Sequence, residues 1–147
     1  MIINIRKFKE ADFQAILNVY AASKLDELRN EKTAFELLPL EKDIKRLKRL
    51  QESDIYVCEE DGIIGYAAHC GSEISALFVH PRGRRKGIGK CLLEFILSII
   101  PEPAELYVAN SNTLAKELYK KYGFKIVEEF ETTYNHVPVL ANKMTRT

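Results

Sequence analysis

The 147-residue sequence contains no tryptophan and only three cysteines. Cys58, Cys70 and Cys91 are odd in number and lack the spacing of metal ligands. We therefore expect neither a disulfide framework nor a bound metal. Buried free thiols are typical of a protein in a reducing cytoplasm, and the sequence predicts a cytoplasmic protein.

Long apolar segments are also missing. No stretch approaches the roughly 20 apolar residues needed to cross a bilayer, and no apolar signal run follows Met1. The formal net charge is only +1, so the chain as a whole has no general attraction for nucleic acid or membrane surfaces. With 46% hydrophobic residues and no repeat or low-complexity linker, the sequence predicts a single domain over residues 1–147.

The most informative pattern lies between Ile74 and Ile100. Its first six residues are mainly apolar and predict a buried strand, which Pro81 ends because proline cannot donate to a sheet. A short loop rich in arginine and glycine follows. A helix is then predicted to run to about Ile100, where Pro101 ends it, with one apolar face formed by Ile88, Leu92, Phe95, Ile96 and Ile99.

This succession of strand, loop and helix suits phosphate binding. The first N–H groups of a helix lack partners within it and carry a partial positive charge. Gly87 and Gly89 have no Cβ atom, so a phosphate oxygen can approach those groups closely. The loop also carries four cations that suit a ligand with several phosphates, namely Arg82, Arg84, Arg85 and Lys86.

Two common phosphate loops do not fit this stretch. The mononucleotide loop needs a longer spacing than that between Gly83 and Gly87, and it needs a Lys-Ser/Thr pair that is missing here. The dinucleotide fingerprint needs a third glycine where the sequence has Leu92. The pattern present is a Val-x-Pro strand end, a basic residue, two further residues and Gly-x-Gly, formed by Val79, Pro81, Arg84, Gly87 and Gly89.

That pattern resembles the loop that holds the acetyl-CoA pyrophosphate in the GNAT superfamily of N-acetyltransferases. The main departure is Arg85, which stands where the family has a glycine. A second family signature is matched in all five positions by Asn112-x-x-Ala115-x-x-x-Tyr119-x-x-x-Gly123-Phe124. The sequence therefore resembles the small, single-domain bacterial members of this superfamily.

The predicted elements follow the order βααβββαβαββ, which is also the order of that family. The resemblance implies an α/β (α+β) fold with a mixed, mostly antiparallel central sheet of about seven strands, flanked by four helices. The strands are expected at residues 1–6, 55–60, 63–69, 73–79, 105–108, 124–132 and 137–144, and the helices at about 10–20, 41–52, 88–100 and 113–122. Residues 23–39 are expected to form a loop or a short helical piece.

Turn and packing residues are predicted as well. Asp61-Gly62 predicts a hairpin turn, and Gly123 predicts a left-handed helix end. The buried face of the second helix is expected to contain Ile44, Leu47 and Gln51, and that of the last helix Leu114, Ala115, Leu118 and Tyr122.

The resemblance also implies where acetyl-CoA would bind. Backbone groups of Leu77, Phe78 and Val79 would pair with its pantetheine arm, where the sheet of this family splays, and one N–H would serve the thioester oxygen. Asn112 would contact the cofactor, cap its helix, or do both. The pyrophosphate would lie against the loop and helix start, at Arg84, Arg85, Lys86, Gly87, Ile88, Gly89 and Lys90.

Acetyl transfer needs a neutral amine and a proton for the departing thiolate. At neutral pH, deprotonating a lysine-type amine costs roughly 4.6 kcal/mol and an α-amine only about 1 kcal/mol, so the first acceptor needs a base. By resemblance, Glu73 stands where the histone-modifying branch has its base, and Tyr119 where many members have the acid. His69, His80 and His136 are alternative bases, and solvent-facing or packing roles stay open for Glu73 and Tyr119.

The sequence thus predicts an acetyl-CoA-dependent N-acetyltransferase that acts on a primary amine of a small molecule or peptide by direct transfer in a ternary complex. A non-catalytic acyl-CoA-binding or sensing module stays open. A nucleic-acid-binding domain is disfavoured by the low net charge. Asp26, Glu27 and Glu31 could attract a cationic acceptor or face solvent. We expect a monomer or homodimer without nucleic-acid or membrane partners.

Overall fold

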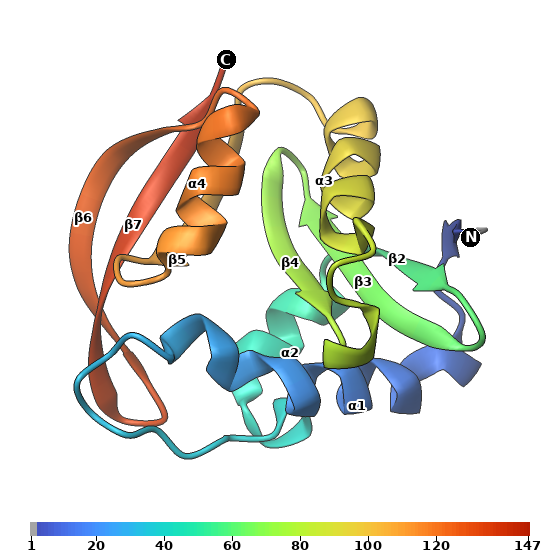
Figure 1. Cartoon of the computed structure of the whole chain (residues 1–147), viewed down its shortest axis with the longest axis horizontal. Helices are drawn as coiled ribbons and strands as arrows, with labels where there is room; N and C mark the ends of the chain where they lie inside the picture. The colour runs from blue at the N-terminus through green and yellow to red at the C-terminus, as the bar shows by residue number, and fades with distance from the viewer. Residues whose placement is uncertain (1–2) are drawn as a thin grey trace.

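One seven-stranded sheet forms the centre of the computed structural model, which describes residues 3–147 (Figure 1). The strand order is β1-β2-β3-β4-β5-β7-β6. The first predicted strand begins at Met1, and its first two residues lie outside the described part of the chain. The strands are β1 Asn4–Lys7, β2 Asp54–Glu59, β3 Ile63–Cys70, β4 Glu73–Val79, β5 Ala104–Ala109, β6 Lys125–Tyr134 and β7 Val137–Arg146.

Helices cover both faces of this sheet. They are α1 Phe13–Ser23, α2 Ile44–Gln51, α3 Ile88–Ile99 and α4 Thr113–Lys121. Side chains of α1 and α2, such as Ile16 and Leu50, share one buried cluster with β2 and β3. Side chains of α3 and α4, such as Leu92 and Leu118, belong to a second cluster that includes β5 and β7. The predicted element order, the mixed sheet of seven strands and the four helices are confirmed.

The sheet consists of two antiparallel groups that meet at one position. β1 to β4 pair in sequence, and β7 pairs with both β5 and β6. β4 and β5 run parallel and are in register only at Glu73 and Glu105. Beyond that point the described residues of β4 form no further pair with β5, and the two strands diverge. This divergence fixes the place of the cleft described below.

The predicted packing face of α2 is confirmed at Leu47 and wrong at Ile44 and Gln51. Ile44 is 81% exposed and Gln51 is also exposed, whereas Leu50 is buried and Leu47 half-buried. The helix begins later than predicted, because Asp43 caps it by accepting a hydrogen bond from the Arg46 N–H. The preceding residues form a short 3-10 turn instead.

Two further exposed side chains correct the predicted faces. Ile99 of α3 is 42% exposed, and Leu93 is the buried residue that the spacing missed. Leu114 of α4 is 68% exposed because it borders the cleft instead of the core. The predicted hairpin turn is confirmed by the positive φ angles of Asp61 and Gly62, 54° and 94°, and the predicted left-handed helix end by the φ of 91° at Gly123.

The segment between α1 and α2 lies under the β6–β7 hairpin (Figure 1). It starts as a 3-10 helix, Lys24–Leu28, and continues without regular structure to Pro39. Leu28 packs with Tyr134 and Val139, and the Tyr134 hydroxyl accepts a hydrogen bond of 2.7 Å from the Leu38 N–H. The segment therefore connects the two groups of strands. No helix within residues 3–147 is long and apolar enough to span a membrane.

Two buried tyrosines give a matched test of this packing. Tyr20 and Tyr134 are each 2% exposed, but within residues 3–147 only the Tyr134 hydroxyl has a hydrogen-bond partner. We expect Tyr134→Phe to lower the free energy of unfolding by about 1–2 kcal/mol, because it leaves the Leu38 N–H without its acceptor. Tyr20→Phe should be close to neutral or stabilising. Urea unfolding measures both changes, and equal destabilisation by the two variants would contradict the prediction.

Candidate active site

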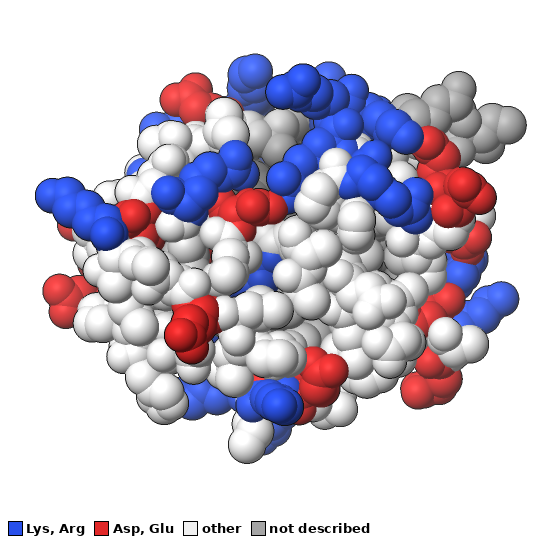
Figure 2. Space-filling model, turned by 60° about the horizontal axis from the view of Figure 1, so that its bottom comes forward, with Lys and Arg blue, Asp and Glu red and all other residues white. Residues whose placement is uncertain are grey.

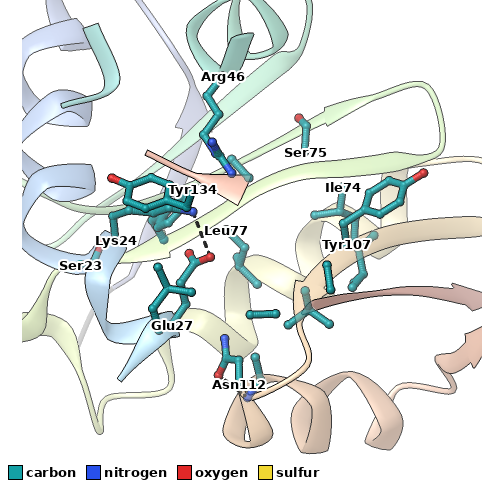
Figure 3. A pocket seen from close by; sticks show the side chains of 18 of the residues that line it. Ser23, Lys24, Glu27, Arg46, Ile74, Ser75, Leu77, Tyr107, Asn112 and Tyr134 are labelled. Carbon is teal, nitrogen blue, oxygen red and sulfur yellow. Dashed lines mark hydrogen bonds and ion pairs between the residues drawn. The ribbon is translucent and has the colours of Figure 1, made fainter. Parts of the chain in front are cut away.

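A cleft of about 710 Å³ opens where β4 and β5 diverge (Figure 3). Its walls come from β4, β5, the start of α4, the end of α1 and the β6–β7 hairpin. Of the sequence-predicted site residues, seven line it: Leu77, Phe78, Val79, Arg84, Gly89, Asn112 and Tyr119. The divergence of two strands thus brings together residues from both signature stretches.

β4 presents an unpaired backbone edge to this cleft. The His80 N–H donates to the Ile64 carbonyl of β3 at 2.7 Å, and Phe78 lies opposite Tyr66. Because backbone groups point to alternate sides along a strand, those of Leu77 and Val79 point away from β3. Within the described chain they have no partner on β5. An extended ligand can therefore pair with β4 as an added strand.

The glycine loop offers a cradle of free N–H groups at one end of the cleft. The first backbone bond of α3 runs from the Cys91 N–H to the Gly87 carbonyl. In the described residues, no backbone N–H from Arg85 to Lys90 has a hydrogen-bond partner. Six successive donors at a helix start fit a pyrophosphate.

Two left-handed residues shape this loop. Gly87 has φ 77° and Arg85 has φ 64°. The family's glycine at the position of Arg85 has a physical reason, because an L-residue there is held in a conformation that costs roughly 1–2 kcal/mol. The departure changes the side chain but keeps the backbone path. Ile88 is only 1% exposed as a whole residue, and its side chain belongs to the core.

Acidic residues already pair with cations of the loop. Arg84 pairs with Asp26, and Lys86 Nζ lies 2.9 Å from Glu60 Oε1. Arg82 instead donates to backbone carbonyls of the β2–β3 turn. Figure 2 shows Lys and Arg side chains gathered along one margin of the face it presents, with acidic side chains beside them. On that face the positive charge is concentrated at this margin, and the rest of the face is mostly uncharged.

Tyr119 and Asn112 lie on the α4 side of the cleft. The Tyr119 ring packs edge-on against Phe124, with centroids 5.9 Å apart, and burial raises the pKa of its hydroxyl. The phenol therefore stays protonated at neutral pH. Asn112 caps α4, because its side-chain oxygen accepts a hydrogen bond of 3.3 Å from the Ala115 N–H. Its position at the cleft edge (Figure 3) leaves cofactor contact through the amide nitrogen open.

Glu73 lies apart from these groups. It is at the start of β4, where β4 and β5 are still paired, and its carboxylate forms an ion pair with Arg49. It is not among the residues that line the cleft, and neither are the histidines at positions 69, 80 and 136. The role of Glu73 as a base stays a prediction.

The structure brings one further pair into the cleft, Lys24 and Glu27 (Figure 3). Lys24 Nζ lies 2.9 Å from Glu27 Oε2. Lys24 as a whole residue is only 5% exposed. Three rings surround the ammonium, with centroids at 5.1 Å for Tyr134 and 5.9 Å for both Tyr20 and Phe78. We call these rings the aromatic cage. The acidic residues Asp26, Glu27 and Glu31 were a sequence signal for this end of the cleft.

Comparisons with known proteins agree with this architecture. A model of the GNAT acetyltransferase domain matches residues 51–126. The chain is 32% identical over 136 residues to the peptidyl-lysine N-acetyltransferase YjaB of Salmonella typhimurium, with 89% of each protein covered. The Escherichia coli protein of the same name is 29% identical over 133 residues, covering 89% of this chain and 88% of that protein. The solution structure of apo-form YjaB from Escherichia coli aligns with a TM-score of 0.75 at 25% identity, covering 100% of this chain and 99% of that one.

The matched domain contains the elements that form the glycine-loop end of the cleft. Residues 51–126 include β4, the glycine loop, α3, β5 and α4. The YjaB relatives extend the similarity over most of the chain. The protein therefore belongs to the GNAT family and is an acetyl-CoA-dependent N-acetyltransferase.

Proposed function

We propose that this enzyme acetylates the ε-amine of lysine side chains in peptides or proteins, by direct transfer from acetyl-CoA in a ternary complex. The Lys24–Glu27 pair carries the proposal, because the cleft holds a primary ammonium against a carboxylate and an aromatic cage. A peptidyl lysine presents the same chemical group. The printed names of the YjaB relatives, peptidyl-lysine N-acetyltransferases, support this acceptor class.

The cofactor would occupy the half of the cleft between the glycine loop and β4. The free N–H groups from Arg85 to Lys90 would bind the pyrophosphate, and Arg84 and Lys86 would exchange their carboxylate partners for phosphate oxygens. The pantetheine arm would pair with the backbone of Leu77 and Val79. This arrangement directs the thioester toward the half that contains Glu27.

The acceptor must first lose a proton. An ordinary lysine ammonium needs a base, since its deprotonation at neutral pH costs roughly 4.6 kcal/mol. We assign this role to Glu27, whose carboxylate already contacts an ammonium in the cleft. A backbone N–H of β4 would stabilise the tetrahedral oxyanion, and Tyr119 would donate its proton to the departing thiolate.

Glu73 is the competing assignment for the base. Its family position favours it, whereas its ion pair with Arg49 and its place outside the cleft lining favour Glu27. Both are glutamates, so the same isosteric change to glutamine removes the negative charge from either one. This makes the two residues matched controls for each other.

We expect the wild-type enzyme to acetylate an Nα-blocked peptide at lysine and to act poorly on a peptide whose only amine is the α-amine. Glu27→Gln should lower kcat/KM for the lysine peptide by about 10²-fold or more, because base catalysis is lost. Glu73→Gln should have a much smaller effect.

A thiol-release assay with peptide mass spectrometry measures these rates, and circular dichroism checks that both variants are folded. A larger loss in Glu73→Gln would return the base to Glu73. Acetylation of α-amines alone would contradict the lysine proposal itself.

Tyr119→Phe should lower kcat by about 10²–10⁴-fold with little change in KM, since the lost hydroxyl acts chiefly in the transition state. The ring and its packing against Phe124 are kept, so the melting temperature should change little. Steady-state kinetics on the lysine peptide test this expectation. Wild-type kcat with chemistry shown to be rate-limiting would leave Tyr119 with a packing role only.

Gly89→Asp should weaken CoA binding at least tenfold, or about 1.4 kcal/mol, because it places a negative charge beside the pyrophosphate. Gly89→Ala is the matched control, since its Cβ would lie 3.7 Å from Val79 Cγ2, an ordinary contact. Alanine also favours helix, so that variant should be at least as stable as wild type. Titration calorimetry compares the three affinities, and equal CoA binding by folded Gly89→Asp would remove the pyrophosphate from this helix start.

A further inference from the structure

Lys24 is a buried lysine inside the cleft of an enzyme that acetylates amines. Buried lysines are rare in proteins unless they are paired. In the described chain, Lys24 is the one lysine that lines the cleft, and its ammonium lies within the aromatic cage beside Glu27. The mechanism proposed above does not use this amine.

The position of Lys24 is fixed by the end of α1. Ser23, the last residue of that helix, donates its hydroxyl to the Val19 carbonyl at 2.6 Å, and Lys24 begins the following 3-10 helix. Its side chain crosses to β4, where Nζ lies 5.9 Å from the ring centroid of Phe78. Phe78 stands between Leu77 and Val79, the residues whose backbone edge faces the cleft. The amine is therefore held beside the strand along which the thioester would lie.

The surroundings of Lys24 favour a reactive amine. Burial lowers the pKa of its ammonium, and the nearby Arg46 guanidinium acts in the same direction. Glu27 and Asp43 oppose this effect. A lowered pKa makes the neutral, nucleophilic amine easier to form.

We propose that the enzyme acetylates its own Lys24 when acetyl-CoA is bound and no acceptor fills the cleft. This inference rests on the proposed function, because it uses the same cofactor site and the same proton carriers. The Nζ lone pair attacks the thioester carbonyl carbon, so that a C–N bond forms and the C–S bond breaks. Before the attack, the Lys24 ammonium gives one proton to Glu27, which releases it to solvent and leaves Nζ neutral. After the attack, the second proton from Nζ passes to Glu27 and the thiolate takes a proton from Tyr119, so the products are Nε-acetyl-Lys24 and free CoA. Proton exchange with solvent then restores Glu27 and Tyr119, and one proton is released overall.

Acetylation changes the charge balance of the cleft. The acetylated nitrogen carries no positive charge and cannot pair with Glu27 as an ammonium does. The carboxylate is then left without its cation in a partly buried place, which an incoming lysine ammonium can fill. After self-acetylation, the cation beside Glu27 would be the ammonium of an acceptor lysine instead of that of Lys24.

The test is to incubate the wild-type protein with acetyl-CoA alone and to follow each lysine by quantitative peptide mass spectrometry. Lys45 and Lys48 are exposed on α2 and report non-enzymatic acetylation in the same sample. We expect Lys24 to be acetylated faster than both, at a rate that does not depend on protein concentration. In Tyr119→Phe the rate at Lys24 should fall by about 10²–10⁴-fold, while the rates at Lys45 and Lys48 should not change.

Two controls separate this inference from the proposed function. Lys24→Arg keeps a cation beside Glu27 but should show no acetyl group at position 24. A lysine peptide assayed in parallel reports transfer to an external acceptor. If the peptide is acetylated while Lys24 stays unmodified, the inference is wrong and the proposed function stands. If Lys24 reacts no faster than Lys45, or equally fast in Tyr119→Phe, the modification is non-enzymatic and the inference is also wrong.

Discussion

The pairing of β4 with β5 at the single position of Glu73 and Glu105 determines where the cleft opens and which backbone edge stays unpaired. A strand in the middle of a sheet normally has both backbone edges satisfied, because a buried and unpaired peptide group costs about 1–3 kcal/mol. The edge of Leu77 and Val79 can stay open only while it faces solvent or a bound chain. The core on either face of the sheet is complete without it. The divergence of two strands therefore creates a binding edge without weakening the packing.

Because β4 and β5 pair at one position only, the sheet itself joins the two groups of strands weakly. The segment after α1 supplies another connection, because Leu28 and Tyr134 pack together while the Tyr134 hydroxyl bonds to Leu38. This connection also places Lys24 and Glu27 in the cleft. The residues that join the two groups are thus next to Lys24 and Glu27, so the shape of that end of the cleft depends on a loop outside the sheet.

The local structure at the glycine-loop end of the cleft could be predicted from the sequence because its determinants are local. The left-handed turn at Gly87, the helix cap at Asn112 and the strand end at Pro81 each depend only on residues nearby in the sequence. The structure places all three as the spacing indicates. The Lys24–Glu27 end of the cleft could not be predicted in this way. Lys24 reaches β4 across the fold, and nothing in its immediate sequence distinguishes it from a surface lysine. The predicted face of α2 was also partly wrong. Asp43 caps this helix later than expected, and Ile44, now its first residue, is exposed.

The ion pair in the cleft is difficult to explain by stability alone. Removing two charges from water costs several kcal/mol per ion, and apolar residues of similar volume often stabilise a protein equally well or better. The aromatic cage recovers part of that cost, since an ammonium within about 6 Å of a ring face is attracted to it. A cage and a carboxylate that can hold one ammonium can also hold another of the same shape. Under the proposed function, Lys24 and an acceptor lysine cannot occupy this place together, so the acceptor must displace the Lys24 ammonium or bind after Lys24 has been acetylated.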